Sequence, residues 1–186
     1  MPSQRLDMMI LLALELEEAG KESGDRSLQN IAVAVCHEPT FVGKSATLTL
    51  FLRERLAAFS SSTSIQLTFL LGFDTLERLF APRYYGSESA MKDALRRFLL
   101  PSGDNSRIVC ARRSPGASYK FTDTSVLDAA AEFVESGSIE FADIGEEERA
   151  LSSSEVREDT SDGWGAKVPT AVAAYIKEKH LYRRSS

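Results

Sequence analysis

The sequence contains few of the residues that usually bind metals or form disulfides. Among its 186 residues it has two cysteines, Cys36 and Cys110, and two histidines, His37 and His180. Each cysteine lies in a short apolar run of strand length, where cysteine behaves as a small buried hydrophobic residue. The spacing of these four residues matches no metal-ligand motif. We therefore expect no disulfide, no redox role and no metal site built by the chain.

Long apolar segments and positive charge are also scarce. No run approaches the roughly 18 apolar residues of a membrane span. The first residues lack the basic stretch and apolar run of a signal peptide. A net charge of −5 argues against general binding to nucleic acid or to anionic membranes. We expect a soluble protein of the cytoplasm or nucleus, in which any phosphate is recognised by a local basic pocket.

The hydrophobic content of 43% is sufficient for one sizeable core, so a single domain over residues 1–186 is expected. Helical periodicity predicts a first helix over residues 4–19 that ends at Gly20, and further helices over residues 44–59, 87–100 and 125–135. Short apolar runs predict strands over residues 31–36, 65–71, 107–111 and 139–142. This alternation predicts an α/β fold: a doubly wound, Rossmann-like parallel sheet with helices on both faces.

One predicted strand runs directly into the sequence Gly72-Phe73-Asp74, a glycine turn that leads into a helix. Arg112 follows the next predicted strand in the same way. Ligands of open parallel sheets bind beyond the carboxyl ends of the strands. Gly72, Asp74 and Arg112 are therefore candidate ligand-binding residues.

A second candidate site lies near the C-terminus, where the chain reads Leu151-Ser152-Ser153-Ser154-Glu155-Val156-Arg157. Three hydroxyls at the start of a short helix, with an arginine one turn inside it, combine free backbone N–H groups, the helix dipole and a guanidinium. This arrangement is typical of a phosphate site. Serine runs are also ordinary helix caps, and a cap needs no ligand.

Blocks spread over most of the chain together resemble the nicotinamide-nucleotide adenylyltransferase family, in particular its divergent fungal branch. They are the series Pro2, Arg5, Met8 and Leu12-Ala13, the Gly72 to Leu76 turn, Pro82-Arg83-Tyr84-Tyr85, Leu151 to Arg157, and Val168 to Tyr182. The pair formed by the serine-arginine motif and the following Val-Pro helix carries most of the resemblance.

The resemblance implies a role for most of the candidate residues. Ser152, Ser153, Ser154 and Arg157 correspond to residues that contact the ATP phosphates, and Arg157 would act in catalysis. Gly72 and Asp74 would lie against the nucleotide, with Asp74 accepting hydrogen bonds from ribose hydroxyls. Tyr85 would stack near the nicotinamide ring. Arg112, a candidate through its position at a strand end and not through the resemblance, is expected to bind substrate. ATP is implied as a substrate and Mg²⁺ as its companion ion.

The family's Gly-x-Phe-x-Pro-x-His-x-Gly-His stretch is missing from this sequence. Neither His37 nor His180 stands in such a setting. By resemblance the chain begins at the helix that carries Arg5 and Met8, so the first strand, first helix and second strand of the family fold are expected to be absent. The simplest interpretation is an N-terminally truncated nucleotidyltransferase-like domain.

Two classes of function follow. The first is adenylylation of nicotinamide mononucleotide by ATP, giving NAD and pyrophosphate, or a related transfer to another phosphate-bearing substrate. The second is a catalytically inactive module that binds a nucleotide or a partner, which the missing histidines favour. Oligomeric state is left open.

Several candidate residues also have a purely structural interpretation. Asp74 could cap a helix that starts at Thr75, and the two tyrosines after Pro82 could be ordinary packing residues. Structural interpretations also exist for other residues. Lys44 could be a solvated charge, Arg112-Arg113 could be a surface pair, and Tyr175, Ile176 and Leu181 could be core contacts.

Overall fold

The computed structural model describes residues 2–58, 64–112, 124–145, 156–157 and 162–182. The chain divides into two compact units. Unit 1 combines residues 1–35 with residues 150–186, and unit 2 covers residues 36–149. The single domain predicted from the sequence stays a prediction, and each unit is described by itself.

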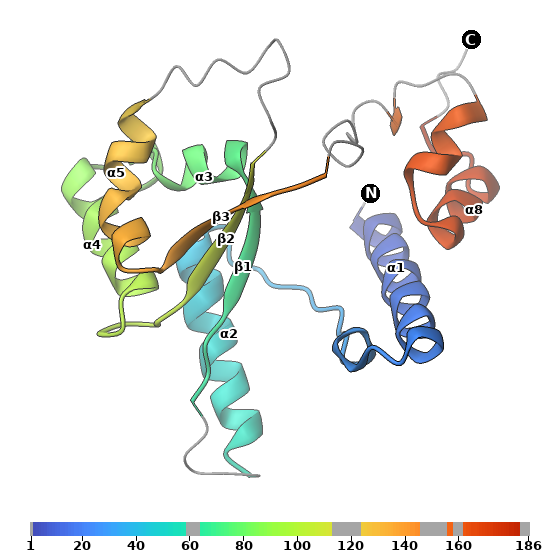
Figure 1. Ribbon diagram of the computed structural model, residues 1–186, viewed down its shortest axis with the longest axis horizontal. Coiled ribbons are helices and arrows are strands. Elements are labelled where there is room, and N and C mark those ends of the chain that lie inside the picture. The colour runs from blue at the N-terminus through green and yellow to red at the C-terminus, as the bar shows by residue number, and fades with distance from the viewer. Residues whose placement is uncertain (1, 59–63, 113–123, 146–155, 158–161, 183–186) are drawn as a thin grey trace. The chain divides into compact units, whose positions relative to one another are not determined.

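Unit 2 contains a three-stranded parallel sheet in its described residues (Figure 1). Its strands are β1 (Thr68–Gly72), β2 (Arg107–Arg112) and β3 (Ile139–Asp143), in the order β1-β2-β3. Phe69 of β1 pairs with Ile108 of β2, and Ile108 pairs with Ile139 of β3. The mixed α/β class and the parallel strands predicted from the sequence are confirmed.

Helices connect these strands and precede them along the chain. They are α2 (Phe41–Leu56), α3 (Phe73–Leu79), α4 (Glu88–Leu99) and α5 (Thr124–Glu135), with a short 3-10 turn, η2 (Pro82–Tyr84), before α4. The predicted helices over residues 87–100 and 125–135 are confirmed within one or two residues. The predicted helix over residues 44–59 begins earlier, because the Thr40 hydroxyl caps it by accepting from the Gly43 N–H at 3.0 Å.

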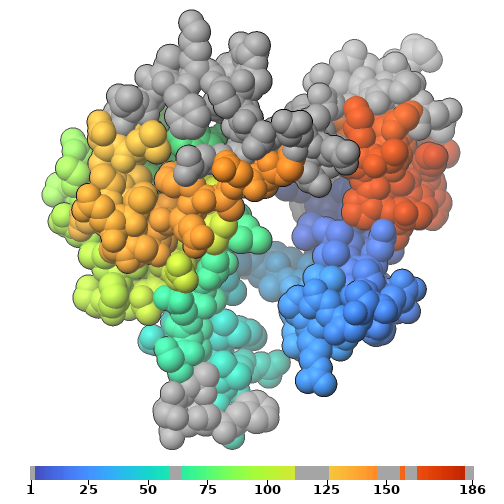
Figure 2. Space-filling view, viewed as in Figure 1, coloured from blue at the N-terminus to red at the C-terminus, as the bar shows by residue number. Residues whose placement is uncertain are grey.

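The sequence of α4 shows why these segments are helical. Ser87 caps its start by accepting a hydrogen bond from the Ala90 N–H at 3.1 Å. Its buried residues recur at helical spacing, so one face of the helix enters the core. They are Met91, Leu95, Phe98 and Leu99. Side chains fill the space between α4 and α5 (Figure 2).

The core of unit 2 lies on one face of the sheet. Phe69 and Leu71 of β1 and their register partners Ile108 and Cys110 of β2 pack on this face with residues of all four helices. Leu70 points to the opposite face and is 79% exposed. Among the described residues of unit 2, the packed helices therefore cover one face of the sheet, whereas the sequence predicts helices on both. The reason is tertiary: Phe69, Leu70 and Leu71 of β1 are all apolar, as in a strand covered on both faces, but Leu70 stays exposed because the packing of the helices decides which face is covered.

The predicted strand over residues 31–36 is wrong. This segment is irregular, and its side chains are half-buried or exposed, including that of Cys36. Alternate small and branched apolar residues favour a strand only where a neighbouring strand can satisfy the backbone. No described residue pairs with this segment.

Unit 1 is helical in its described residues. It contains α1 (Pro2–Ser23), the 3-10 helix η1 (Arg26–Gln29), the 3-10 helix η3 (Asp162–Lys167) and α8 (Thr170–Glu178). Two polar contacts join α1 to α8. The Tyr175 hydroxyl donates to the Asp7 carboxylate at 2.6 Å, and the Glu15 carboxylate accepts from the first backbone N–H groups of α8.

Gly20 lies inside α1 rather than at its end, so the predicted helix stop is wrong by one turn. Gly20 is buried, and a Cβ on it would lie 2.7 Å from the Cβ of Leu28. The glycine therefore lets η1 fold back closely against α1. Gly24, with a φ of +73°, follows the helix and is the residue that allows the chain to turn.

Candidate functional site

Two predicted binding residues lie at the carboxyl ends of adjacent strands. Gly72 is the last residue of β1 and pairs in register with Ala111 of β2. Arg112 follows Ala111, ends β2 and pairs with Asp143 of β3. The parallel sheet therefore brings Gly72 and the Arg112 backbone to one edge of unit 2, as the sequence predicts. We call Gly72, Asp74, Arg112 and Asp143 the strand-end group.

Asp74 is held close to this edge because β1 passes into α3 without a loop. Gly72 is both the last residue of β1 and the N-cap of α3, and Asp74 lies in the first turn of that helix. A Cβ on Gly72 would lie 3.0 Å from the Asp74 Oδ1, so the carboxylate sits over the glycine backbone. The helix begins at Phe73, so Asp74 is not the cap of a helix that starts at Thr75.

The Asp74 side chain is exposed, whereas Leu76 and Leu79 of the same helix are buried. Burial of these leucines fixes the direction of α3 and leaves the carboxylate accessible. An exposed carboxylate beside a residue without a side chain can accept hydrogen bonds from the hydroxyls of a closely approaching ligand.

Asp143 is a member of the strand-end group that sequence reasoning missed. It is exposed and lies opposite Arg112 in the ladder. The predicted strand ended at residue 142, one residue short of it. The sequence held a signal for this residue: Ile139, Phe141 and Asp143 stand at every second position, as side chains on one face of a strand do, so the strand could have been extended to residue 143. A carboxylate next to an arginine position lowers the local positive charge at this edge.

The two tyrosines after Pro82 have different surroundings. Tyr85 is half-buried against the core, and its hydroxyl donates to the Leu79 carbonyl at 3.0 Å. Burial raises the pKa of Tyr85 to about 12. Tyr84 is 54% exposed, and the Arg83 guanidinium lies 5.0 Å from its ring centre. Tyr85 therefore packs against the core and Tyr84 faces solvent, while the predicted stacking of Tyr85 near a nicotinamide ring stays a prediction.

The C-terminal phosphate motif is described only in part. Ser152, Ser153 and Ser154 lie outside the described residues, so neither their predicted role in phosphate binding nor the alternative, helix capping, is tested. Val156 and Arg157 are helical, and Arg157 is exposed. Arg157 belongs to unit 1, whereas Gly72, Asp74 and Arg112 belong to unit 2. From the sequence we expect Gly72, Arg112 and the segment from Ser152 to Arg157 to gather around one cleft, and this expectation stays a prediction.

The block from Val168 to Tyr182 contains α8, and the Glu15 side chain of α1 binds the first backbone N–H groups of this helix. The Glu15 carboxylate accepts from the Thr170 N–H at 3.1 Å and from the Ala171 N–H at 2.9 Å. A carboxylate at this position satisfies N–H groups that have no partner within the helix. The interpretation of Ile176 as a core residue is confirmed, since it is 5% exposed.

The two histidines lie on unrelated elements. His37 is in the irregular segment before α2, and His180 follows α8 with a φ of +52°. Within the described ranges, no group of three or more His, Cys, Asp or Glu side chains could hold a metal ion. The helices of the same ranges include none long and apolar enough to cross a membrane.

Comparison of the chain with protein-family models, with curated proteins and with solved structures finds no match.

Proposed function

We propose that the chain is a nucleotidyltransferase-like protein that binds ATP and transfers its AMP moiety to a mononucleotide, with release of pyrophosphate. The acceptor proposed from the sequence resemblance is nicotinamide mononucleotide. One structural observation supports the proposal most. The exposed Asp74 carboxylate lies against the bare backbone of Gly72 at the carboxyl end of a parallel strand.

This arrangement suits a sugar better than a phosphate. A carboxylate accepts hydrogen bonds from hydroxyl groups and repels phosphate oxygens. Gly72 leaves room for a ligand to approach the backbone. Asp74 is therefore proposed to bind ribose hydroxyls, and Arg112, on the adjacent strand, to bind a substrate phosphate.

The remaining roles come from the resemblance alone. Ser152, Ser153, Ser154 and Arg157 are proposed to hold the ATP phosphates, with Arg157 stabilising charge in the transition state. Transfer of this kind needs no protein nucleophile, because the acceptor phosphate attacks directly. Mg²⁺ would arrive with ATP and neutralise part of the charge on its phosphates.

A second candidate is a module that binds nucleotide without catalysis. The sequence favours it, since neither His37 nor His180 stands in the histidine-pair motif of the family that the chain resembles. Preorganised positive donors around a transferring phosphoryl group are worth about 2.7–4 kcal/mol each. A chain without such a histidine pair would bind substrates more readily than it would convert them.

Calorimetric titration of the full chain with Mg·ATP tests the binding step. If Asp74 accepts from the ribose, Asp74→Asn should weaken binding about tenfold, because hydrogen bonds to a charged group contribute about 1.5–3 kcal/mol. Asp128→Asn is the matched control, since Asp128 is exposed on α5. Equal affinity of the wild type and Asp74→Asn would exclude the strand-end group as the ATP site.

Pyrophosphate release with ATP and nicotinamide mononucleotide separates the two candidates. Release that depends on both substrates supports the transferase. ATP binding that depends on Asp74, without pyrophosphate release, supports the noncatalytic module. Absence of both would overturn the proposed function.

A further inference from the structure

Among the residues that the structure describes, the backbone hydrogen-bonding groups on the outer edge of β1 have no partner strand. On its other side β1 pairs with β2, and no described residue pairs with its outer edge. The Arg107 N–H donates to the Leu67 carbonyl at 2.7 Å, so residue 67 faces β2. Backbone groups alternate along a strand. Thr68 and Leu70 therefore direct their N–H and C=O groups toward the outer edge. Gly72 directs its N–H there, whereas its C=O, as that of the N-cap residue, belongs to the first turn of α3.

The chemistry of β1 leaves this edge unprotected. Its sequence, Thr68-Phe69-Leu70-Leu71-Gly72, contains no charge and no proline. Leu70, in the middle of the strand, is 79% exposed, more than any other large hydrophobic side chain in the described parts of the chain. The opposite edge strand, β3, carries exposed Glu140 and Asp143. Charged residues protect sheet edges against strand addition, so β1 is the edge open to it.

We propose that β1 pairs antiparallel with β1 of a second copy of this chain, about a two-fold axis at Leu70. The backbone groups of residue 70 face outward, so the two Leu70 residues exchange both N–H···O=C bonds as a hydrogen-bonded pair. The Gly72 N–H of each copy then donates to the Thr68 C=O of the other. The three-stranded sheets join into one continuous sheet.

The side chains of β1 are complementary to themselves in this register. Phe69 lies opposite Leu71 of the second copy on the core face, and Leu71 lies opposite Phe69. The two Leu70 side chains meet on the uncovered face. Aromatic–aliphatic and aliphatic pairs stabilise antiparallel strands. A two-fold interface requires such self-complementarity, because the same surface of each copy forms both sides of the contact. The second copy also supplies a strand without charge, which matches the uncharged edge of β1.

The contact is limited to one short strand from each copy, so the dimer should be concentration-dependent. Sedimentation velocity over a concentration series should show the 20.5 kDa chain approaching twice its mass as concentration rises. Leu70→Lys should remain at the single-chain mass with an unchanged circular dichroism spectrum. Val134→Lys is the matched control, because Val134 is 40% exposed on α5, and it should dimerise as the wild type does.

Cross-linking identifies the paired residue directly. The Cα atoms of a hydrogen-bonded antiparallel pair are about 5.5 Å apart, within the range of a disulfide. Leu70→Cys should therefore give a covalent dimer on mild oxidation, and Val134→Cys should not. A wild type that stays single at every concentration, or Leu70→Lys that dimerises like the wild type, would overturn the proposal. A single chain whose residue 70 amide resists hydrogen exchange would show that the chain itself covers this edge, which would also overturn it.

Discussion

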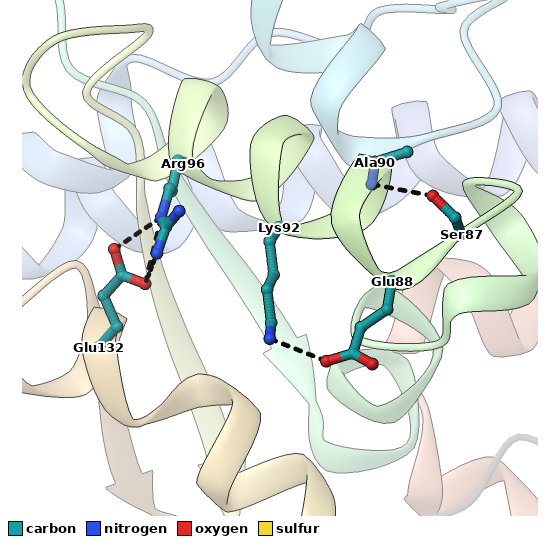
Figure 3. A network of polar contacts seen from close by, with 6 residues as sticks. All are labelled: Ser87, Glu88, Ala90, Lys92, Arg96 and Glu132. Atoms are coloured by element: carbon teal, nitrogen blue, oxygen red, sulfur yellow. Dashed lines mark hydrogen bonds and ion pairs between the residues drawn. The ribbon is translucent and has the colours of Figure 1, made fainter.

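The Arg96 guanidinium donates three hydrogen bonds to the Glu132 carboxylate and thereby joins α4 to α5 (Figure 3). Nε donates to Oε1 at 2.9 Å, and Nη2 donates to Oε2 at 2.9 Å. Both side chains are about half exposed. Neighbouring Lys92 pairs with Glu88 on the same helix at 2.8 Å. The contact therefore links two helices on the surface of the core they share.

This pair predicts a pH-dependent contribution to stability. The hydrogen bond from Arg96 lowers the pKa of Glu132 below 4.5. A carboxylate with a lowered pKa stabilises the folded state above its unfolded pKa, and this is lost as pH falls through the folded pKa. Glu132→Gln should lower the urea midpoint slightly at pH 7 and leave it equal to the wild type in acid. The effect should be small because the pair is exposed. A difference in urea midpoint between the variant and the wild type that persists at low pH would show that Glu132 contributes through packing and not through its charge.

A buried hydroxyl pair predicts a larger effect. Ser45 of α2 and Ser106, just before β2, are fully buried, and their hydroxyl oxygens lie 2.9 Å apart. Ser45→Ala removes one partner and leaves the Ser106 hydroxyl buried without it. The expected loss is about 1–3 kcal/mol of unfolding free energy, measured by urea denaturation.

The double variant Ser45→Ala/Ser106→Ala provides the control for this loss. Removing both hydroxyls eliminates the unsatisfied group, so the double variant should lose less than the sum of the two single variants. Strict additivity would show that the two serines do not interact.

The contact between Glu15 and α8 predicts a local effect confined to unit 1. Glu15→Ala removes the carboxylate that binds the first N–H groups of α8, at an expected cost of about 1 kcal/mol. Amide hydrogen exchange should quicken in residues 170–178 and stay unchanged in β2. Glu22→Ala, an exposed residue of the same helix α1, should alter neither.

Arg157 carries the prediction for phosphate binding. Arg157→Ala should weaken ATP binding by about 1.5–3 kcal/mol if its guanidinium makes a charge-assisted bond to a phosphate, and Arg157→Lys should weaken it less. Calorimetric titration measures both variants. Unchanged affinity in Arg157→Ala would place the phosphates elsewhere.

Local patterns predicted the elements of unit 2 well where the chain carries its own signals. Ser87 caps α4, and the buried positions of that helix recur at helical spacing, so its bounds could be read from the sequence. In β2 the residues between Arg107 and Arg112 are apolar, and this short run predicts a buried strand. These signals are short-range, and their outcome depends little on the rest of the fold.

The errors come from properties that depend on tertiary neighbours. Residues 31–36 have the composition of a strand, but no described strand lies beside them. Gly20 resembles a helix stop, yet η1 packs against it from outside the helix. The covered face of the sheet could not be deduced either, because the exposure of Leu70 depends on which helices pack nearby.

The strand-end group shows the same division. The order of strands and the position of Gly72 were predictable, because parallel strands end at one edge. Asp143 was missed because the predicted strand ended one residue too short. Of the two tyrosines after Pro82, Tyr84 is exposed and Tyr85 is half-buried, and the predicted stacking of Tyr85 near a nicotinamide ring stays a prediction. The choice between adjacent tyrosines depends on the hydrogen bond from Tyr85 to Leu79, which no local pattern specifies.

Because β1 passes directly into α3 at Gly72, the position of Asp74 is fixed relative to the sheet. With no loop between strand and helix, a single inserted residue would rotate α3 by about 100° and withdraw Leu76 from the core. The junction therefore tolerates no length variation. A ligand bound by Asp74, as proposed, would be held in the same frame as the strands, without a hinge that could adapt to a differently shaped one.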